Sequence, residues 1–468
     1  MGNSSIKFGT SGLRGLAHDL LAGEAHRYAC AFLAHLAVGG RLGSGRVLIG
    51  RDLRASSGQI ALDCISAAAA AGLTPVDCGV VPTPALALQA MSEASPAIMV
   101  TGSHIPADRN GLKFYGPEGE ISKTDEAGIV AALRAPGMRQ PARAQSENAA
   151  LERYIERYRA LLPEAALAGW RIGVFEHSTV LRDILAQLLI GFGAEVVRLG
   201  RSETFVALDT EAPDDPVFAP LAGWVWQQGL DAVISADGDG DRPLIVDGNG
   251  DFVRGDALAA IAARFLGAVA VATPVTSNSS VTSLFGRVER TRVGSPYVIA
   301  AMRELAEAGA RPVIGFEANG GLMLGSTIAV EGMTLPALPT RDAVLPLLAV
   351  LGYAARERAS IAELVVSLGF RPALSGRLQD ICAERAAAFL TRLSDAHFAG
   401  EVFAGQGNIA SRSQIDGEGF TLSNGAVVHF RASGNAPELR CYVEAASAGE
   451  AEALLAWGLG KARQYLAG

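Results

Sequence analysis

Lysine is scarce in this chain of 468 residues, and nearly all of its positive charge is arginine. The net charge of −8 argues against a nucleic acid as the main partner. The chain also lacks an apolar run of the roughly 18 residues that a membrane span needs, and its start, MGNSSIKFG, does not follow the pattern of a signal peptide. The lysines are Lys7, Lys113, Lys123 and Lys461.

Cysteines are few, odd in number and never spaced as CxxC. This argues against both a disulfide framework and a structural zinc site. A reducing cytosol fits best, so we expect a cytoplasmic protein. We expect a monomer or a homodimer, and neither a membrane nor a nucleic acid as partner. The cysteines are Cys30, Cys64, Cys78, Cys382 and Cys441.

A strand-helix-strand pattern recurs over residues 46–79, 171–199 and 294–316. Three such units predict three related α/β domains. After Gly369 the pattern changes and predicts a smaller α+β domain, with strands at 398–403, 426–431 and 439–445 and a closing helix at 448–466. A helix over 146–162 joins the first two domains, and the expected domains are 1–150, 151–253, 254–369 and 370–468.

The stretch TGSHIPADRNGLKFY, residues 101–115, presents a hydroxyl group at the end of a strand. It follows the apolar run 97–100, which predicts a short buried strand, and turns at Gly102. A serine becomes nucleophilic when neighbours accept its proton or neutralise a developing charge. Ser103 is therefore a candidate nucleophile, with His104 and Lys113 as candidate catalytic partners. The alternative is a serine that only caps a helix.

The loop DGDGDR, residues 237–242, lies between two predicted strands. Asp237, Asp239 and Asp241 alternate with other residues, two of them glycines, and can converge on one hard cation, either Mg²⁺ or Ca²⁺. An EF-hand is excluded because Arg242 occupies the place of its required glycine. A carboxylate site with open positions favours Mg²⁺ completed by a phosphate oxygen. A solvated acidic turn is the alternative, although three neighbouring carboxylates repel one another without a cation.

Three further loops suit anions or sugars. FGTSGLRG, residues 8–15, carries Arg14 among small residues whose amides can approach an anion. Glu317 and Asn319 follow a predicted strand and can accept hydrogen bonds from vicinal sugar hydroxyls. The last loop combines two arginines with a serine and glycine-flanked amides in a phosphate cradle, with a solvated hairpin as the alternative. Its candidates are Arg431, Ser433, Gly434, Asn435 and Arg440.

Together, these stretches resemble the α-D-phosphohexomutase family, which includes phosphomannomutases, phosphoglucomutases and phosphoglucosamine mutases. FGTSGLRG, TGSHIPADRNGLKFY, DGDGDR, GFEANGG and RASGNAPELRCYVEA stand in the family's order and rough spacing. The resemblance implies three related α/β domains and an α+β domain around a central cleft. It also implies an isomerase that moves phosphate between C1 and C6 of a hexose, through a phosphoserine and a hexose 1,6-bisphosphate, which serves as activator.

The resemblance assigns a role to each matching residue. Ser103 would carry the phosphate, which completes a Mg²⁺ site with Asp237, Asp239 and Asp241. Arg14 and Lys113 would flank the transferring phosphoryl group, with Lys113 as a candidate general acid or base. Candidate contacts to the sugar phosphate are Arg242, Glu317, Asn319, Arg431, Ser433, Gly434, Asn435 and Arg440.

The chain departs from the family's usual residues at several motif positions. Ile105 replaces Asn, Asn319 replaces Ser, Gly321 stands where His is common, and Asn435-Ala436 replaces Thr-Glu. The sequence of the 317–319 loop favours mannose phosphate as the substrate, with glucose phosphate and glucosamine phosphate as alternatives. Outside the mutases, the alternatives are a metal-dependent sugar phosphatase and a non-catalytic sugar-phosphate sensor.

Overall fold

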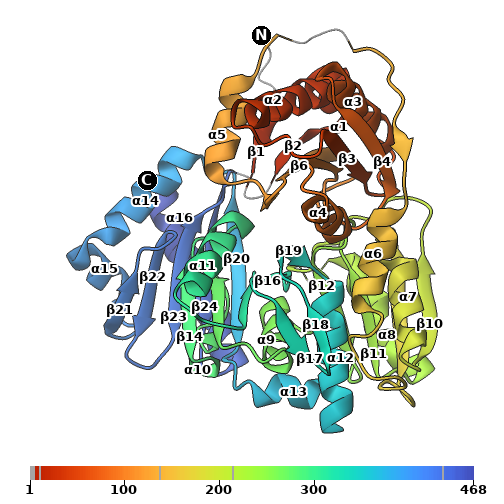
Figure 1. The fold of residues 1–468 in the computed structure, drawn as a ribbon. Helices are drawn as coiled ribbons and strands as arrows, with labels where there is room; N and C mark the ends of the chain where they lie inside the picture. Colours follow the sequence, from red (N-terminus) through yellow and green to blue (C-terminus); the bar gives the residue numbers. More distant parts are fainter. Residues whose placement is uncertain (1–5, 10–11, 136–138, 213–214, 435–436, 468) are drawn as a thin grey trace.

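The computed structural model of the chain describes residues 6–9, 12–135, 139–212, 215–434 and 437–467. Four successive units are visible in Figure 1, each built on its own main sheet: red to orange, yellow, green to cyan, and blue. Three units combine parallel strands with helices, and the fourth has an antiparallel sheet. The expectation of three α/β units and one α+β unit is confirmed.

The first unit has the strand order β1-β2-β6-β5-β3-β4-β8, with β7 paired to β6. Alternate residues of β3 are buried on opposite faces: Val47 and Ile49 pack with α2 and α3, and Leu48 packs with α4. Both faces are covered, which explains the continuous apolar strands. The elements are β1 (Lys7–Phe8), β2 (Leu13–Leu16), α1 (Ala17–Asp19), the π-helical η1 (Leu20–Glu24), α2 (Ala25–Val38), β3 (Arg46–Arg51), α3 (Ser57–Ala70), β4 (Thr74–Val80), α4 (Thr83–Ser92), β5 (Ala97–Val100), β6 (Arg109–Gly116), β7 (Gly119–Glu120), α5 (Lys123–Ala132) and β8 (Gln145–Ser146).

The second unit has the strand order β10-β9-β11-β12 and follows the connecting helix α6 (Ala149–Tyr158), which is shorter than predicted. Its helix α8 ends at Gly229, whose φ of 59° is the left-handed conformation common after a helix. The elements are β9 (Arg171–His177), α7 (Arg182–Gly191), β10 (Glu195–Arg201), the 3₁₀ helix η2 (Pro216–Phe218), α8 (Ala219–Gln228), β11 (Ala232–Ala236) and β12 (Pro243–Asp247).

The third unit has the strand order β14-β13-β15-β16-β19, and β17 and β18 form a separate hairpin. Ser360 and Glu363 begin its last helix with a capping box, which satisfies two backbone amides. The elements are α9 (Gly255–Phe265), β13 (Ala270–Pro274), α10 (Val281–Leu284), β14 (Arg287–Thr291), α11 (Ser295–Glu307), β15 (Val313–Phe316), β16 (Leu322–Leu324), β17 (Ile328–Val330), β18 (Met333–Leu335), β19 (Leu338–Asp342), α12 (Val344–Glu357) and α13 (Ile361–Ser367).

The three α/β units share one topology. In each, a central strand pairs in parallel with the two strands that follow it in the chain, giving β4-β3-β5, β10-β9-β11 and β14-β13-β15. A fourth strand, β6, β12 or β16, then pairs antiparallel with the third. The turns into these antiparallel strands contain residues 101–108, 237–242 and 317–321. Three of the predicted loops therefore occupy equivalent places, at carboxyl ends of parallel strands, where α/β sheets bind ligands.

The fourth unit has the strand order β20-β24-β23-β22-β21. The strand predicted over 398–403 is wrong, because these residues belong to helix α15. Phe398, Ala399, Val402 and Phe403 are buried at helical spacing, and the Asp395 side chain accepts a hydrogen bond from the Phe398 amide, 2.8 Å. The elements are β20 (Ala373–Gln379), α14 (Ala383–Ser394), α15 (Ala396–Phe403), β21 (Ile409–Ser413), β22 (Glu418–Leu422), β23 (Val427–Ala432), β24 (Glu438–Glu444) and α16 (Ala448–Ala467).

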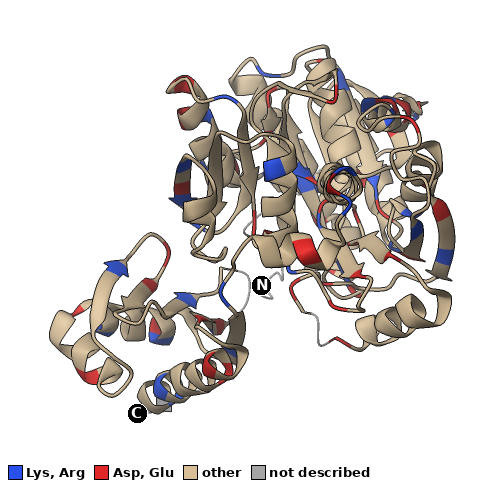
Figure 2. Ribbon diagram, turned by 90° about the horizontal axis from the view of Figure 1, so that it is seen from below, with Lys and Arg blue, Asp and Glu red and all other residues tan. Residues whose placement is uncertain are grey.

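Apolar packing divides the molecule unequally. The largest buried cluster runs through the second and third units, whereas the fourth unit has a cluster of its own. Polar contacts link the third and fourth units, such as Arg254 Nη1 to the carbonyl of Ala373, 2.6 Å, and Ser279 N to Glu444 Oε1, 2.8 Å. Figure 2 shows the C-terminal unit on one side of the molecule. Within the described residues, no helix combines the length and apolar character of a membrane span.

Candidate active site

A cleft with an empty volume of about 690 Å³, its open mouth included, lies where the four units meet. Five of its lining residues are arginines, which suits a ligand carrying phosphate or carboxylate groups. The lining residues are Arg14 and His104 from the first unit, Asp209, Glu211 and Arg242 from the second, Pro274, Thr276, Val293, Glu317, Ala318, Asn319 and Arg341 from the third, and Arg431, Ser433, Arg440 and Tyr442 from the fourth.

Ser103 lies in the turn between β5 and β6 and is only 1% exposed. Its Oγ donates a hydrogen bond to a carboxylate oxygen of Asp237 in the second unit and lies 3.3 Å from Nδ1 of His104. The φ of Ser103 is 53°, a left-handed conformation that is unfavourable for a residue with a side chain. Its amide donates to Thr101 Oγ1, 2.8 Å. The loop thus holds a strained serine against the neighbouring unit.

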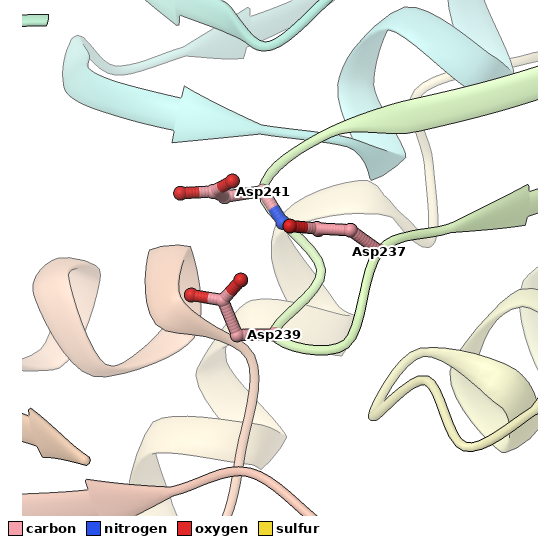
Figure 3. A group of neighbouring side chains, drawn as sticks. All are labelled: Asp237, Asp239 and Asp241. Carbon is pink, nitrogen blue, oxygen red and sulfur yellow. The ribbon is translucent and has the colours of Figure 1, made fainter. Parts of the chain in front are cut away.

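Asp237, Asp239 and Asp241 lie in the turn between β11 and β12, and one carboxylate oxygen of each lies within 4.8 Å of the other two. Figure 3 shows the side chains of Asp239 and Asp241 projecting from the loop, while that of Asp237 points across the loop toward Asp241. The loop is closed by Asp237 Oδ1, which accepts hydrogen bonds from the amides of Asp241 and Arg242, each 3.1 Å. All three residues are at most 1% exposed, so this is not the solvated acidic turn considered above.

The donor set of this triad fits a divalent cation. Oδ1 of Asp239 and Oδ1 of Asp241 are buried and have no hydrogen-bond partner among the described residues, an arrangement that is costly for carboxylate oxygens. Burial and the charges of Asp239 and Asp241 raise the pKa of Asp237 well above its ordinary value. A divalent cation would offset both the repulsion and the unsatisfied oxygens.

Lys113, on β6, binds the same triad from the first unit. Its Nζ donates to Oδ2 of Asp239, 2.6 Å, and to Oδ2 of Asp241, 2.5 Å. Burial alone would lower the pKa of Lys113, but Asp239 and Asp241 outweigh it and raise the pKa, so the side chain is an ammonium ion. In the cleft, burial and then Arg242 lower the pKa of His104 well below 6.5, and its imidazole is neutral.

Burial also lowers the pKa of the Arg14 guanidinium, to about 10, and the charges of Arg242 and Arg341 add to this effect. Arg242 Nη1 lies 3.4 Å from Asp209 Oδ1 and 3.5 Å from Glu211 Oε2, both of the same unit. Arg14, Arg242 and Arg341 are thus close enough for their positive charges to affect one another in the cleft.

Arg341, at the end of β19, is a site residue that the sequence analysis missed. Its Nη2 and Nε donate to Asp241 Oδ2, 2.8 and 3.1 Å, and its Nη1 donates to Glu317 Oε2, 2.5 Å. Arg341 thus joins the loop of the aspartate triad, residues 237–242 and here called the cation loop, to the loop of Glu317 and Asn319. A Cβ atom at Gly321 would lie 2.8 Å from Cδ of Arg341. The glycine in place of the usual histidine was the available signal, because it leaves room for this arginine.

The loop between β23 and β24 brings Arg431, Ser433 and Arg440 to the cleft. Arg431 Nε donates to Asp416 Oδ2, 2.6 Å, and Arg440 Nε and Nη2 each lie 3.4 Å from Glu438 Oε2. Gly434 is exposed and is not among the lining residues. Asn435, predicted to contact substrate, lies outside the described residues.

Comparisons with known proteins identify the family of the chain. Sequence models described as phosphoglucomutase/phosphomannomutase alpha/beta/alpha domain I, alpha/beta/alpha domain III and C-terminal domain match residues 5–139, 254–368 and 382–456. The phosphomannomutase of Sinorhizobium fredii is 48% identical over 97% of this chain and 98% of its own length. The phosphoglucosamine mutase of Gluconacetobacter diazotrophicus is 32% identical over 76% of this chain and 80% of its own length.

The fold also matches a solved structure from Thermus thermophilus, with a TM-score of 0.79 and 24% identity over 99% of this chain and all of the other. The chain belongs to the phosphoglucomutase/phosphomannomutase family, the α-D-phosphohexomutases. It is accordingly a mutase, an enzyme of the isomerase class.

Proposed function

We propose that this enzyme interconverts mannose 1-phosphate and mannose 6-phosphate through a phosphoserine at Ser103. One observation carries the proposal: Ser103 Oγ is hydrogen-bonded to a buried aspartate triad beneath a cleft lined by five arginines. A phosphoryl donor, a cation site and a phosphate-binding wall are the parts that phosphoryl transfer requires.

In the first half-reaction, a sugar hydroxyl oxygen forms a bond to the phosphorus on Ser103 while the bond from phosphorus to Ser103 Oγ breaks. The products are a hexose 1,6-bisphosphate and free Ser103. Asp237, Asp239 and Asp241 would hold Mg²⁺ together with a phosphate oxygen. Bound there, Mg²⁺ would neutralise charge on the phosphoryl group.

The proton balance requires one proton to leave the sugar hydroxyl and one to reach Ser103 Oγ. Lys113 is protonated and is suited to donate a proton or to neutralise charge on the phosphoryl oxygens. His104 is neutral, and its Nδ1 lies 3.3 Å from Ser103 Oγ, which suits it to take the proton of Ser103 in the second half-reaction, when the free serine attacks the bisphosphate. Arg14 supplies a further positive charge to the transferring group.

The bisphosphate then turns end for end and returns its other phosphate to Ser103. The same intermediate, added as an activator, would phosphorylate the free serine. The phosphate that is not reacting would bind Arg431, Arg440 and Ser433, because a bidentate guanidinium fits phosphate. Arg242, Glu317 and Asn319 would contact the substrate in the middle of the cleft.

Mannose is the proposed sugar because the phosphomannomutase of Sinorhizobium fredii matches nearly the whole chain at 48% identity, whereas the phosphoglucosamine mutase of Gluconacetobacter diazotrophicus matches less of it at 32%. Phosphorus NMR tests the sugar and the reaction together. The protein is given Mg²⁺, a trace of hexose 1,6-bisphosphate, and equal amounts of mannose, glucose and glucosamine 1-phosphates. We expect mannose 6-phosphate to form first, without inorganic phosphate.

Release of inorganic phosphate would instead identify a phosphatase, and the absence of any change would favour a binding protein. A second sample that contains Ser103→Ala tests the phosphoserine. If this variant kept wild-type activity, the proposed mechanism would be wrong.

A further inference from the structure

Arg54, in the turn between β3 and α3, has a fully buried side chain. It binds the backbone of residues 101–109, the serine loop and the first residue of β6. Its Nη1 donates to the carbonyls of Pro106 and Arg109, 2.7 and 2.9 Å. Its Nη2 donates to the carbonyls of Ser103 and Ile105, 2.9 and 2.6 Å. Its Nε donates to Asp52 Oδ2, 3.2 Å.

These five bonds use all five N–H groups of the guanidinium. None remains for a substrate, so Arg54 does not act as a phosphate-binding arginine like those that line the cleft. Its position also depends on Gly102, because a Cβ atom there would lie 2.6 Å from Arg54 Cζ.

A second support reaches the amide of Ser103. Asp52 Oδ2 accepts a hydrogen bond from Thr101 Oγ1, 2.8 Å, and Thr101 Oγ1 accepts one from the Ser103 amide, 2.8 Å. Arg54 and Asp52 therefore hold Ser103 on both its carbonyl and amide sides. Their bonds offset the unfavourable φ of 53° at a residue whose Oγ has to point toward the triad.

Phe205, in the segment after β10, extends this support into the second unit. Its ring lies over the Arg54 guanidinium, with Cζ 3.9 Å from the ring centroid. The same ring lies against the cation loop, since a Cβ atom at Gly238 would be 2.9 Å from Phe205 Cε2 and 2.9 Å from the Ser103 carbonyl oxygen. The Phe205 ring thus contacts both Arg54, which holds the serine loop, and the cation loop.

We propose that Arg54 and Phe205 are positioning residues that fix Ser103 Oγ against the aspartate triad across the boundary between the first and second units. The inference rests on the proposed phosphoserine mechanism. In-line phosphoryl transfer tolerates little displacement, and misplacement by about 1 Å can cost on the order of 100-fold in rate. The pair acts on the transfer step and not on substrate binding, because neither residue is among those lining the cleft.

The test compares Phe205→Ala with Phe252→Ala. Phe252 is a half-buried phenylalanine of the same unit, with its ring 5.8 Å from that of Phe218. With saturating Mg²⁺ and bisphosphate, we expect F205A to lower kcat by about 10- to 100-fold and to change KM by less than about twofold. F252A keeps kcat within about twofold of wild type, although its thermal stability falls as well.

Hydrogen exchange of the peptide covering residues 101–112 gives a readout that does not depend on activity. We expect faster exchange in F205A and wild-type exchange in F252A, because only F205A loosens the support of this loop. Arg54→Lys should resemble F205A with a larger loss of kcat, since an ammonium group cannot bind four carbonyls and a carboxylate. The Arg54→Lys/Phe205→Ala double variant should lose less than the product of the two single losses.

If F205A matched F252A in both kcat and hydrogen exchange, the inference would be overturned even if R54K failed to fold. Failure of the proposed function has a different signature: the wild-type enzyme would not convert mannose 1-phosphate, or Ser103→Ala would remain active. In that case, faster exchange in F205A alone would still support the structural part of the inference, and equal exchange in the two variants would refute it.

Discussion

The serine loop and the cation loop occupy the same topological place in two α/β units, but they are held by opposite means. The cation loop closes on itself, since Asp237 accepts hydrogen bonds from the amides of Asp241 and Arg242. The serine loop is held from outside, because Arg54 binds three of its carbonyls and the carbonyl of Arg109 at the start of β6. The cation loop therefore adds a local closure to the distant contacts of Lys113 and Arg341 with its carboxylates, whereas the position of Ser103 depends mainly on residues distant in the sequence.

The third equivalent loop, around Glu317, shows an intermediate solution. The Asn319 side chain closes its turn by accepting a hydrogen bond from the Gly321 amide, 3.0 Å, while Arg341 ties Glu317 to Asp241 from another strand. The three equivalent loops are thus held in three different ways. Variants that remove the nucleophile, a proposed metal ligand or an external support should show how much each loop contributes to activity.

The largest expected effect is that of Ser103→Ala, which removes the phosphoryl carrier. We expect a loss of activity of roughly 10⁴-fold or more, because the covalent step has no substitute. Because the cation loop closes on itself, the variant should still bind Mn²⁺, as measured by electron paramagnetic resonance. Loss of both activity and Mn²⁺ binding would show that the two loops are not independent.

The second-largest loss of activity should follow from removing a carboxylate of the cation loop. We expect Asp241→Asn to lower kcat by roughly 10²- to 10³-fold, because it removes a charge that would hold the cation at the developing phosphoryl charge. Asp251→Asn, an exposed aspartate of the same unit, is the control and should remain active. Treatment of the wild type with EDTA should abolish activity, and added Mg²⁺ should restore it. Full activity in EDTA would contradict a metal-dependent mechanism.

Local sequence patterns were sufficient to predict the features that are encoded locally. The alternating aspartates of residues 237–242 and the apolar strand before Ser103 indicated two loops that the structure brings into contact. Arg54, Phe205 and Arg341 were missed because each lies far in sequence from the loop that it supports. Helix α15 was predicted as a strand because a short apolar run does not distinguish the two without its N-cap.

A smaller effect should follow from disturbing the support between the second and third loops. We expect Gly321→Ala to lower kcat/KM by about 10-fold, because the added Cβ would lie 2.8 Å from both Arg341 Cδ and the carbonyl oxygen of Asp241, and would shift the Arg341 bridge relative to the cation loop. Gly223→Ala is the control: it lies in helix α8, and the nearest atom to its Cβ is 3.8 Å away. Equal kcat/KM values for the two variants would mean that the Arg341 bridge does not matter for turnover.

The smallest effect on kcat should come from the fourth unit, which has its own core and contacts only the non-reacting phosphate in the proposed cycle. Arg440 lines the cleft, whereas Arg377 binds the same carboxylate, Glu438, without lining it. We expect Arg440→Gln to raise KM by about 10-fold with kcat nearly unchanged, because the lost guanidinium contact is made equally in the ground and transition states. Arg377→Gln should leave KM unchanged in the same steady-state assay. A fall in kcat for R440Q at unchanged KM would instead mean that the fourth unit contributes to the transfer step itself. The assignment of phosphoryl transfer to the first three units and of phosphate binding to the fourth would then be wrong.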